Sequence, residues 1–144
     1  MELTGVALRG DAGASESLAY VMKGAPGRVL IVDDEPHVRG MLRDFLASLG
    51  NEVATAASGA DALKMVPVFQ PEVILTDMLM PGMSGADLLD ALRRAGVTVP
   101  VILISGQPIT MPEGFFGLLR KPFDLRNLAE VVTAAIDQGR TERA

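Results

Sequence analysis

The chain has 144 residues, a formal net charge of −5 and no cysteine. Its length suits one domain, and 49% apolar with 22% charged residues indicates a globular protein rather than a disordered or fibrous one. The lack of cysteine excludes a disulfide scaffold and a thiolate metal site, and the negative charge gives no footprint for nucleic acid. No apolar stretch approaches the roughly 20 residues of a membrane span. We therefore expect a cytoplasmic protein with neither nucleic-acid nor membrane partner.

Residues 1–27 differ in composition from the rest of the chain. They are rich in Gly, Ala and Ser, show no sustained periodicity, and close with a turn-prone cluster at residues 24–27. We interpret them as an N-terminal tail or linker, with room for one or two helical turns at residues 15–23.

After residue 27, short apolar runs alternate with stretches of helical spacing. Apolar runs are typical of strands buried on both faces of a parallel sheet, and they fall at residues 28–32, 52–55, 73–76, 99–104 and 116–120. The predicted helices are residues 36–49, one from Ser58 that Pro67 ends, one from Ser84 that Gly96 ends, and a last one capped by Asp124. This alternation predicts a doubly wound α/β fold with a five-stranded parallel sheet and helices on both faces.

Polar and charged residues lie at the ends of four predicted strands. They are Asp33 and Asp34 after the first, Asp77 after the third, Ser105 after the fourth and Lys121 after the fifth. Parallel α/β sheets carry their functional site at the carboxyl ends of the strands, so these side chains should meet. Adjacent carboxylates repel one another, and a hard divalent cation such as Mg²⁺ relieves that repulsion. Because a carboxylate can attack phosphorus while metal, lysine and hydroxyl neutralise the phosphoryl oxygens, this set predicts phosphoryl transfer to a carboxylate.

The order of these motifs resembles the response-regulator receiver domain over residues 28–138. The matching motifs are Val32-Asp33-Asp34, the stretch Asp-Met-Leu-Met-Pro-Gly-Met-Ser-Gly at 77–85, Ile104-Ser105-Gly106 and Lys121-Pro122-Phe123. The resemblance implies a flavodoxin-like sheet with strand order 2-1-3-4-5. It leaves residues 139–144 as a C-terminal tail.

The resemblance also implies a role for each site residue. Asp77 is the expected phosphoacceptor, Ser105 the switch hydroxyl and Lys121 the contact to the phosphoryl group, and the Lys121–Pro122 peptide is often cis in this family. The implied Mg²⁺ ligands are the carboxylates of Asp33, Asp34 and Asp77 and the backbone carbonyl of Leu79. The implied donor is a histidine kinase or a histidine phosphotransfer protein, and a downstream protein reads the switched surface. No enzymatic activity beyond self-phosphorylation from the donor and slow autodephosphorylation is expected.

The sequence departs from the family pattern between the fourth and fifth strands. Fifteen residues separate Ser105 from Lys121, which leaves roughly ten for a crossover that normally takes a dozen or more. Two prolines and a glycine in this stretch also disfavour a helix, so the fourth helix should be short or missing. Leu118 stands where many receivers carry an aromatic residue. We therefore hypothesise that phosphorylation orders the loop at residues 106–114 instead of turning an aromatic side chain inward.

Other functions fit parts of the sequence. A pseudo-receiver that docks partners without phosphorylation often lacks an acidic residue or the lysine, and this chain has both. A phosphohydrolase of the haloacid-dehalogenase type needs Asp-x-Asp, but Met78 and Leu79 follow Asp77. Dinucleotide binding is not indicated, because no Gly-x-Gly-x-x-Gly follows the first strand. The sequence leaves open whether the domain stands alone or belongs to a longer regulator or hybrid kinase.

Overall fold

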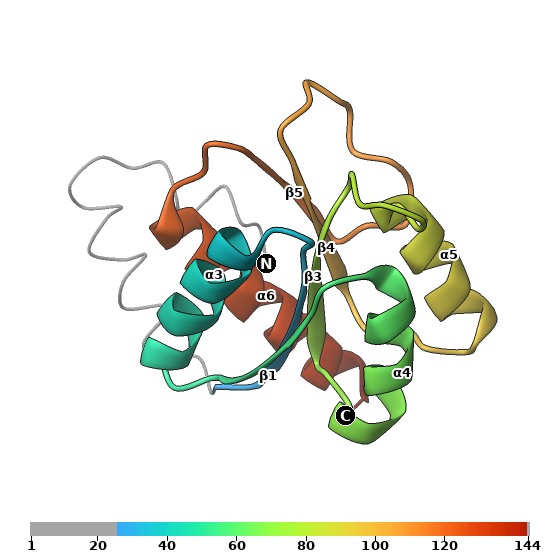
Figure 1. The fold of residues 1–144 in the computed structure, drawn as a ribbon. Coiled ribbons are helices and arrows are strands. Elements are labelled where there is room, and N and C mark those ends of the chain that lie inside the picture. Colours follow the sequence, from blue (N-terminus) through green and yellow to red (C-terminus); the bar gives the residue numbers. More distant parts are fainter. Residues whose placement is uncertain (1–25, 144) are drawn as a thin grey trace.

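Five parallel strands form one sheet in the order β2-β1-β3-β4-β5, as predicted (Figure 1). The structure is a computed structural model that describes residues 26–143, so the predicted helical turns at 15–23 and nearly all of the predicted tail lie outside the described residues. The strands are β1 (Arg28–Val32), β2 (Glu52–Ala56), β3 (Val73–Asp77), β4 (Val101–Ser105) and β5 (Gly117–Arg120). The central strands β1 and β3 are paired in register, which brings their carboxyl ends together.

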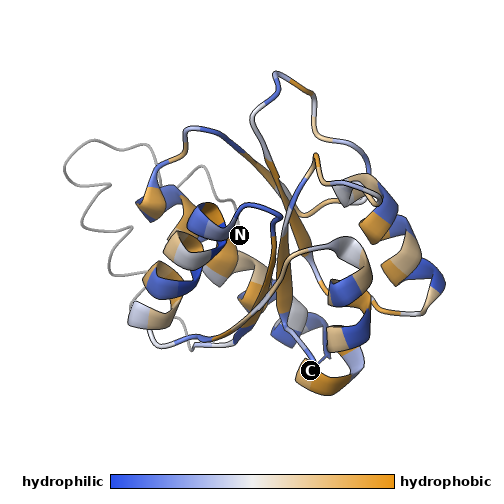
Figure 2. Cartoon of the chain, viewed as in Figure 1, coloured by the Kyte–Doolittle hydropathy of each residue, from blue (hydrophilic) through white to orange (hydrophobic). Residues whose placement is uncertain are grey.

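Four helices among residues 26–143 cover the two faces of the sheet. They are α3 (Pro36–Ser48), α4 (Gly59–Phe69), α5 (Gly85–Arg94) and α6 (Leu125–Arg143). The helices α3 and α6 lie on one face, and α4 and α5 on the other (Figure 1). Alternate residues of each strand point to opposite faces, so Val29 and Ile31 join one apolar cluster while Leu30 and Val32 join the other. Figure 2 shows the resulting arrangement, with mainly hydrophobic strands between helices that carry both hydrophobic and hydrophilic residues.

The predicted helix caps are confirmed. Ser84 and Asp87 form a reciprocal capping box, in which each side chain accepts the backbone N–H of the other at 3.1 Å. Ser58 accepts the N–H of Asp61 at 3.1 Å, and Asp124 accepts that of Arg126 at 2.9 Å. These caps begin α4, α5 and α6 shortly after the ends of β2, β3 and β5, and site residues lie at the ends of the last two of these strands.

The prediction that Pro67 ends the second helix is wrong. Helix α4 continues through Pro67 to Phe69, and Gln70 ends it in the left-handed conformation with a φ of 54°. Proline has no N–H and forfeits one helical hydrogen bond. So close to the end of the helix that loss is tolerated, because the Gln70 N–H still closes the last turn on the Val66 carbonyl at 2.9 Å.

The connection between β4 and β5 contains no helix, which agrees with the prediction that the fourth helix is short or missing. Residues 106–116 form an irregular loop that rises beyond the carboxyl ends of the strands (orange in Figure 1). Phe115 is buried and Ile109 is partly buried, and both pack against the apolar cluster on the side of α4 and α5. The loop therefore covers, with two side chains, part of the sheet that a crossover helix usually covers.

A charged cluster ties α6 to the opposite edge of the sheet, where the strands begin. Glu72 precedes β3, and its side chain is only 8% exposed. It accepts two hydrogen bonds from the Arg140 guanidinium at 2.8 and 3.1 Å, one from Arg143 at 3.3 Å and the Arg28 N–H at 3.2 Å. These contacts, the Arg140 hydrogen bond above all, lower the pKa of the Glu72 carboxyl. Helix α6 thus runs on to Arg143, through most of residues 139–144 that we interpreted as a C-terminal tail.

We predict that Glu72→Gln lowers the free energy of unfolding by about 1–2 kcal/mol at pH 7, since it removes the charge that holds the arginines. A carboxyl with a lowered folded pKa stabilises the fold above its unfolded pKa of about 4.3, and loses that effect as the pH falls through the folded value. The difference between wild type and variant in urea unfolding should therefore shrink toward pH 3. Asp90→Asn, which breaks the exposed Arg94–Asp90 pair, is the matched control and should change stability by less than about 0.5 kcal/mol.

Candidate functional site

Three carboxylates meet at the carboxyl edge of the two central strands. Asp33 and Asp34 follow β1, and Asp77 is the last residue of the neighbouring β3. One oxygen of each carboxylate lies within 4.8 Å of the other two. Asp33 and Asp77 are buried, with 1% and 8% of their surface exposed, whereas Asp34 is exposed. The predicted acidic cluster is therefore assembled, and Asp34 forms its solvent side.

The two oxygens of Asp33 have different surroundings. Its Oδ1 accepts the Glu35 N–H at 2.8 Å, whereas its Oδ2 is buried and has no hydrogen-bond partner. Burial first, and then the nearby Asp77 carboxylate, raise the pKa of the Asp33 carboxyl above its ordinary value. A buried anionic oxygen without a partner is costly, and a hard cation with oxygen ligands would supply the missing interaction. The three carboxylates therefore fit a divalent cation such as Mg²⁺.

Lys121 brings a positive charge to this cluster from the end of β5. Its Nζ lies 3.4 Å from Asp77 Oδ2, and its side chain is 30% exposed. Its backbone N–H donates to the Ser105 carbonyl at 2.8 Å, which fixes the lysine beside the end of β4. The Lys121–Pro122 peptide is cis, as the resemblance implied. The ammonium group thus lies beside the carboxylate predicted to accept the phosphoryl group.

Ser105 ends β4 next to Asp77, because Asp77 is paired in register with Ile104. Its hydroxyl is buried and makes its hydrogen bonds to one residue of the following loop. Ser105 Oγ accepts the Gln107 N–H at 3.0 Å and donates to the Gln107 carbonyl at 3.3 Å. The predicted switch hydroxyl therefore lies beside the acceptor, with its hydrogen bonds directed to the loop.

Leu79 and Leu118 occupy positions where the sequence raised specific expectations. The Leu79 side chain is exposed, and the role of its carbonyl as a metal ligand stays a prediction. Leu118 is partly buried and packs against the apolar cluster on the side of α4 and α5. It therefore acts as a core residue at the position of the usual switch aromatic.

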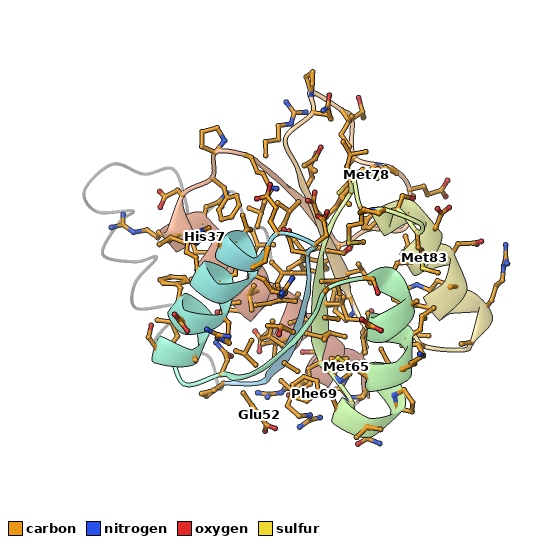
Figure 3. All side chains as sticks on the ribbon, in the orientation of Figure 1. His37, Glu52, Met65, Phe69, Met78 and Met83 are labelled. Atoms are coloured by element: carbon orange, nitrogen blue, oxygen red, sulfur yellow. The ribbon has the colours of Figure 1, made fainter. Side chains whose placement is uncertain are left out.

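Three methionines lie in the segment that follows Asp77. Met80 is buried, and Met78 and Met83 pack against the apolar cluster on the side of α4 and α5. Figure 3 shows Met78 at the end of the sheet where the site residues lie, and Glu52, at the start of β2, at the opposite end. Met83 also lies under the first turn of α4, where a Cβ on Gly59 would meet its Sδ at 2.6 Å. These thioethers fill space beside the site.

Sequence reasoning missed three residues that hold the backbone of the buried aspartates. Arg39 Nη1 donates to the Asp33 carbonyl at 2.7 Å, and Thr76 Oγ1 donates to the Asp77 carbonyl at 3.0 Å. Gly85 lies so close to that carbonyl that a Cβ would come within 2.6 Å of the oxygen. A glycine directly after a capping serine was a visible signal for close packing. The arginine and threonine carried no such signal, since their partners are main-chain atoms.

The family model, the similar sequences and the similar solved structures all point to the same family. The model of the response regulator receiver domain matches residues 29–133. The sensor histidine kinase RcsC of Escherichia coli K12 is 32% identical over 121 residues, which cover 80% of this chain and 13% of the kinase. The Regulator of RpoS of the same organism is 35% identical over 116 residues, covering 76% of this chain and 34% of that protein. A response regulator receiver domain protein from Clostridium thermocellum superposes with a TM-score of 0.74 at 30% identity, covering 80% of this chain and 98% of that one.

The chain therefore belongs to the response regulator receiver domain family of two-component signalling. It spans only 13% of the kinase and 34% of the regulator, so it corresponds to one domain of these longer relatives. Within residues 26–143, no helix has both the length and the apolar character needed to cross a membrane.

We predict that Gly85→Ala destabilises the domain by about 1–3 kcal/mol, because the added methyl group must displace the Asp77 backbone or the start of α5. Urea unfolding measures the loss. Gly40→Ala is the matched control, since a Cβ there meets only an Arg43 side-chain nitrogen at 3.7 Å in the middle of α3. It should stabilise the domain by about 0.5–1 kcal/mol. Equal stability of the two variants would contradict the close approach at Gly85.

Proposed function

We propose that Asp77 accepts a phosphoryl group from a phosphohistidine on a histidine kinase or a histidine phosphotransfer protein. The observation that carries this proposal is the combination of three clustered carboxylates with a buried Asp33 oxygen that lacks a partner, directly beside the Lys121–Asp77 contact. The relatives include a sensor histidine kinase and a response regulator, which supports a donor of that class. In this proposal the protein is a signalling phosphoacceptor and not an enzyme.

In the proposed step, a carboxylate oxygen of Asp77 attacks the phosphorus atom of the donor. The new O–P bond forms as the P–N bond breaks, and the electron pair of that bond stays on the imidazole nitrogen. The product is an acyl phosphate on Asp77 and an unphosphorylated histidine. The Lys121 ammonium group lies 3.4 Å from Asp77 Oδ2 and would pair with a phosphoryl oxygen after the transfer. The buried setting keeps the nucleophile oriented and partly shielded from water.

Asp33, Asp34 and Asp77 would hold Mg²⁺, together with the backbone carbonyl of Leu79. When bound, the ion neutralises negative charge on the phosphoryl oxygens and on the acidic cluster itself. Asp33 contributes an oxygen for which the protein supplies no other partner, and Asp34 contributes one at the solvent side. The backbone contact from Arg39 to Asp33 keeps this turn in place.

The proposed readout is a change in the face formed by the β4–β5 loop, β5 and α6. Ser105 would give up its contacts with Gln107 and donate to a phosphoryl oxygen, and a downstream protein would bind the rearranged face. Leu79, with 60% of its surface exposed, offers neither acid nor base to a hydrolytic water, so autodephosphorylation should be slow. We place this reaction in the cytoplasm, where histidine kinases find ATP and Mg²⁺.

We predict that beryllofluoride in Mg²⁺ buffer binds the protein saturably, because it mimics the phosphoryl group on Asp77. Amide NMR shifts should move around Asp77, Ser105 and Lys121 and along residues 106–116. Asp77→Asn removes the anionic ligand with little change in shape, so the same titration should leave its spectrum unchanged.

A wild-type spectrum that does not respond to beryllofluoride would overturn the proposed phosphoacceptor. The fold and the family would stand, and the function would shift to docking that is independent of phosphorylation. A response that persists in Asp77→Asn would place the acceptor at another residue.

A further inference from the structure

We propose that Arg120 is a positioning residue that latches the loop at residues 106–116, and that this latch opposes the movement of Ser105 toward a phosphoryl group. The inference rests on the proposed function of Asp77. It concerns a side chain that lies outside the acidic cluster and that neither the sequence motifs nor the mechanism above uses.

A continuous chain of hydrogen bonds joins Ser105 to Arg120 through the loop. The Ser105 hydroxyl holds both the N–H and the carbonyl of Gln107, at 3.0 and 3.3 Å. The same Gln107 carbonyl accepts the Ile109 N–H at 2.9 Å. The Ile109 carbonyl in turn accepts Arg120 Nη2 at 2.8 Å. Each link shares a residue with the next, so Arg120 and Ser105 hold the two ends of one segment.

The fold brings the two ends of this chain together. Arg120 is the register partner of Ser105 across the β4–β5 pair, and the next residue, Lys121, donates its N–H to the Ser105 carbonyl at 2.8 Å. The Arg120 side chain is exposed and extends back over the loop to Ile109. A residue beside the switch hydroxyl in the sheet therefore also controls the loop that the hydroxyl binds.

The loop depends on such contacts because it has no helix of its own. On its far side, Phe115 is buried in the apolar cluster next to Gly114, whose φ of 96° suits glycine. On its near side, the partly buried Ile109 is the only loop residue before Phe115 that packs against that cluster within the described residues. The Arg120 hydrogen bond thus holds the backbone of Ile109, the residue whose side chain fixes the first half of the loop to the apolar cluster.

The chain of contacts sets the direction of the effect. Ser105 can donate to a phosphoryl oxygen only if it releases the Gln107 carbonyl, and it leaves the Gln107 N–H without its acceptor. While Arg120 holds Ile109, the loop cannot easily move to give the Gln107 N–H a new acceptor. Without that contact the loop can move, and the cost of the lost hydrogen bond falls. Arg120 should therefore favour the conformation with Ser105 on the loop, and its removal should strengthen binding of a phosphoryl mimic. By reciprocity, the mimic should weaken the Arg120 latch.

The test is an Arg120→Met variant of the full chain, titrated with beryllofluoride in Mg²⁺ buffer and followed by amide NMR. Methionine keeps most of the apolar stem and loses the donor. We expect beryllofluoride affinity to rise at least about fivefold, a typical size for such coupling. Amide exchange at residues 107–110 should be faster in the variant without the mimic. Arg120→Lys, which keeps a donor and the charge, should restore most of the wild-type affinity.

Two further variants distinguish the latch from a general effect of lost positive charge or lost stability. Arg94→Met removes an exposed positive charge from the end of α5 and should leave affinity unchanged. Ser105→Ala removes the other end of the chain, so adding Arg120→Met to it should give no further gain. Simple destabilisation would lower the affinity of Arg120→Met, not raise it.

An Arg120→Met variant with wild-type affinity and wild-type loop exchange would overturn the latch while the phosphoacceptor stands. An equal gain in Arg94→Met would also overturn it, since charge alone would then be the cause. A wild-type protein that does not bind beryllofluoride would overturn the proposed function, and the latch with it.

Discussion

Two buried carboxylates and one exposed carboxylate lie within 4.8 Å of one another, and this concentration of negative charge is the constraint around which the rest of the site is organised. Like charges in a poorly hydrated setting repel strongly, so the cluster needs positive partners and a rigid backbone. Lys121 supplies one partner, and the Asp33 oxygen without a hydrogen bond fits a second, a divalent cation. Arg39, Thr76 and Gly85 fix the backbone of the two buried aspartates.

The contacts that stabilise the fold and the residues of the proposed signalling site lie at opposite edges of the sheet. At the edge where the strands begin, the buried Glu72 carboxylate and the arginines that donate to it tie the last turns of α6 to β3. At the opposite edge the charges are unbalanced and the connecting loop lacks a helix. In the proposed switch, the loop at one edge changes conformation while the central strands and the far edge stay in place. Ser105 and Arg120 lie where the stable sheet meets the adaptable loop.

Much of the fold followed from local patterns in the sequence. Apolar runs located the five strands, and Ser58, Ser84 and Asp124 located helix starts, because caps and buried strands depend on residues close in sequence. A short or missing fourth helix was predictable, because the crossover is short and contains two prolines and a glycine. Pro67 misled the prediction, since the cost of a proline depends on how near the helix end it lies. The extension of α6 to Arg143 was not visible, because its partner Glu72 lies 71 residues earlier in the chain.

The acidic residues, the lysine and the serine of the site were predicted from their positions at the strand ends. Arg39 and Arg120 were not, because they donate to main-chain atoms that only the folded structure brings near.

The most direct test of the central claim is to locate the phosphoryl group itself. The protein is incubated with a phosphorylated histidine kinase or a histidine phosphotransfer protein, with Mg²⁺ or with a chelator. Borohydride then reduces any aspartyl phosphate to homoserine, and peptide mass spectrometry identifies the residue. We expect homoserine at position 77 in the Mg²⁺ sample and none with the chelator. Homoserine at another aspartate, or none at position 77 with a donor that phosphorylates other receivers, would contradict a Mg²⁺-dependent phosphoacceptor at Asp77.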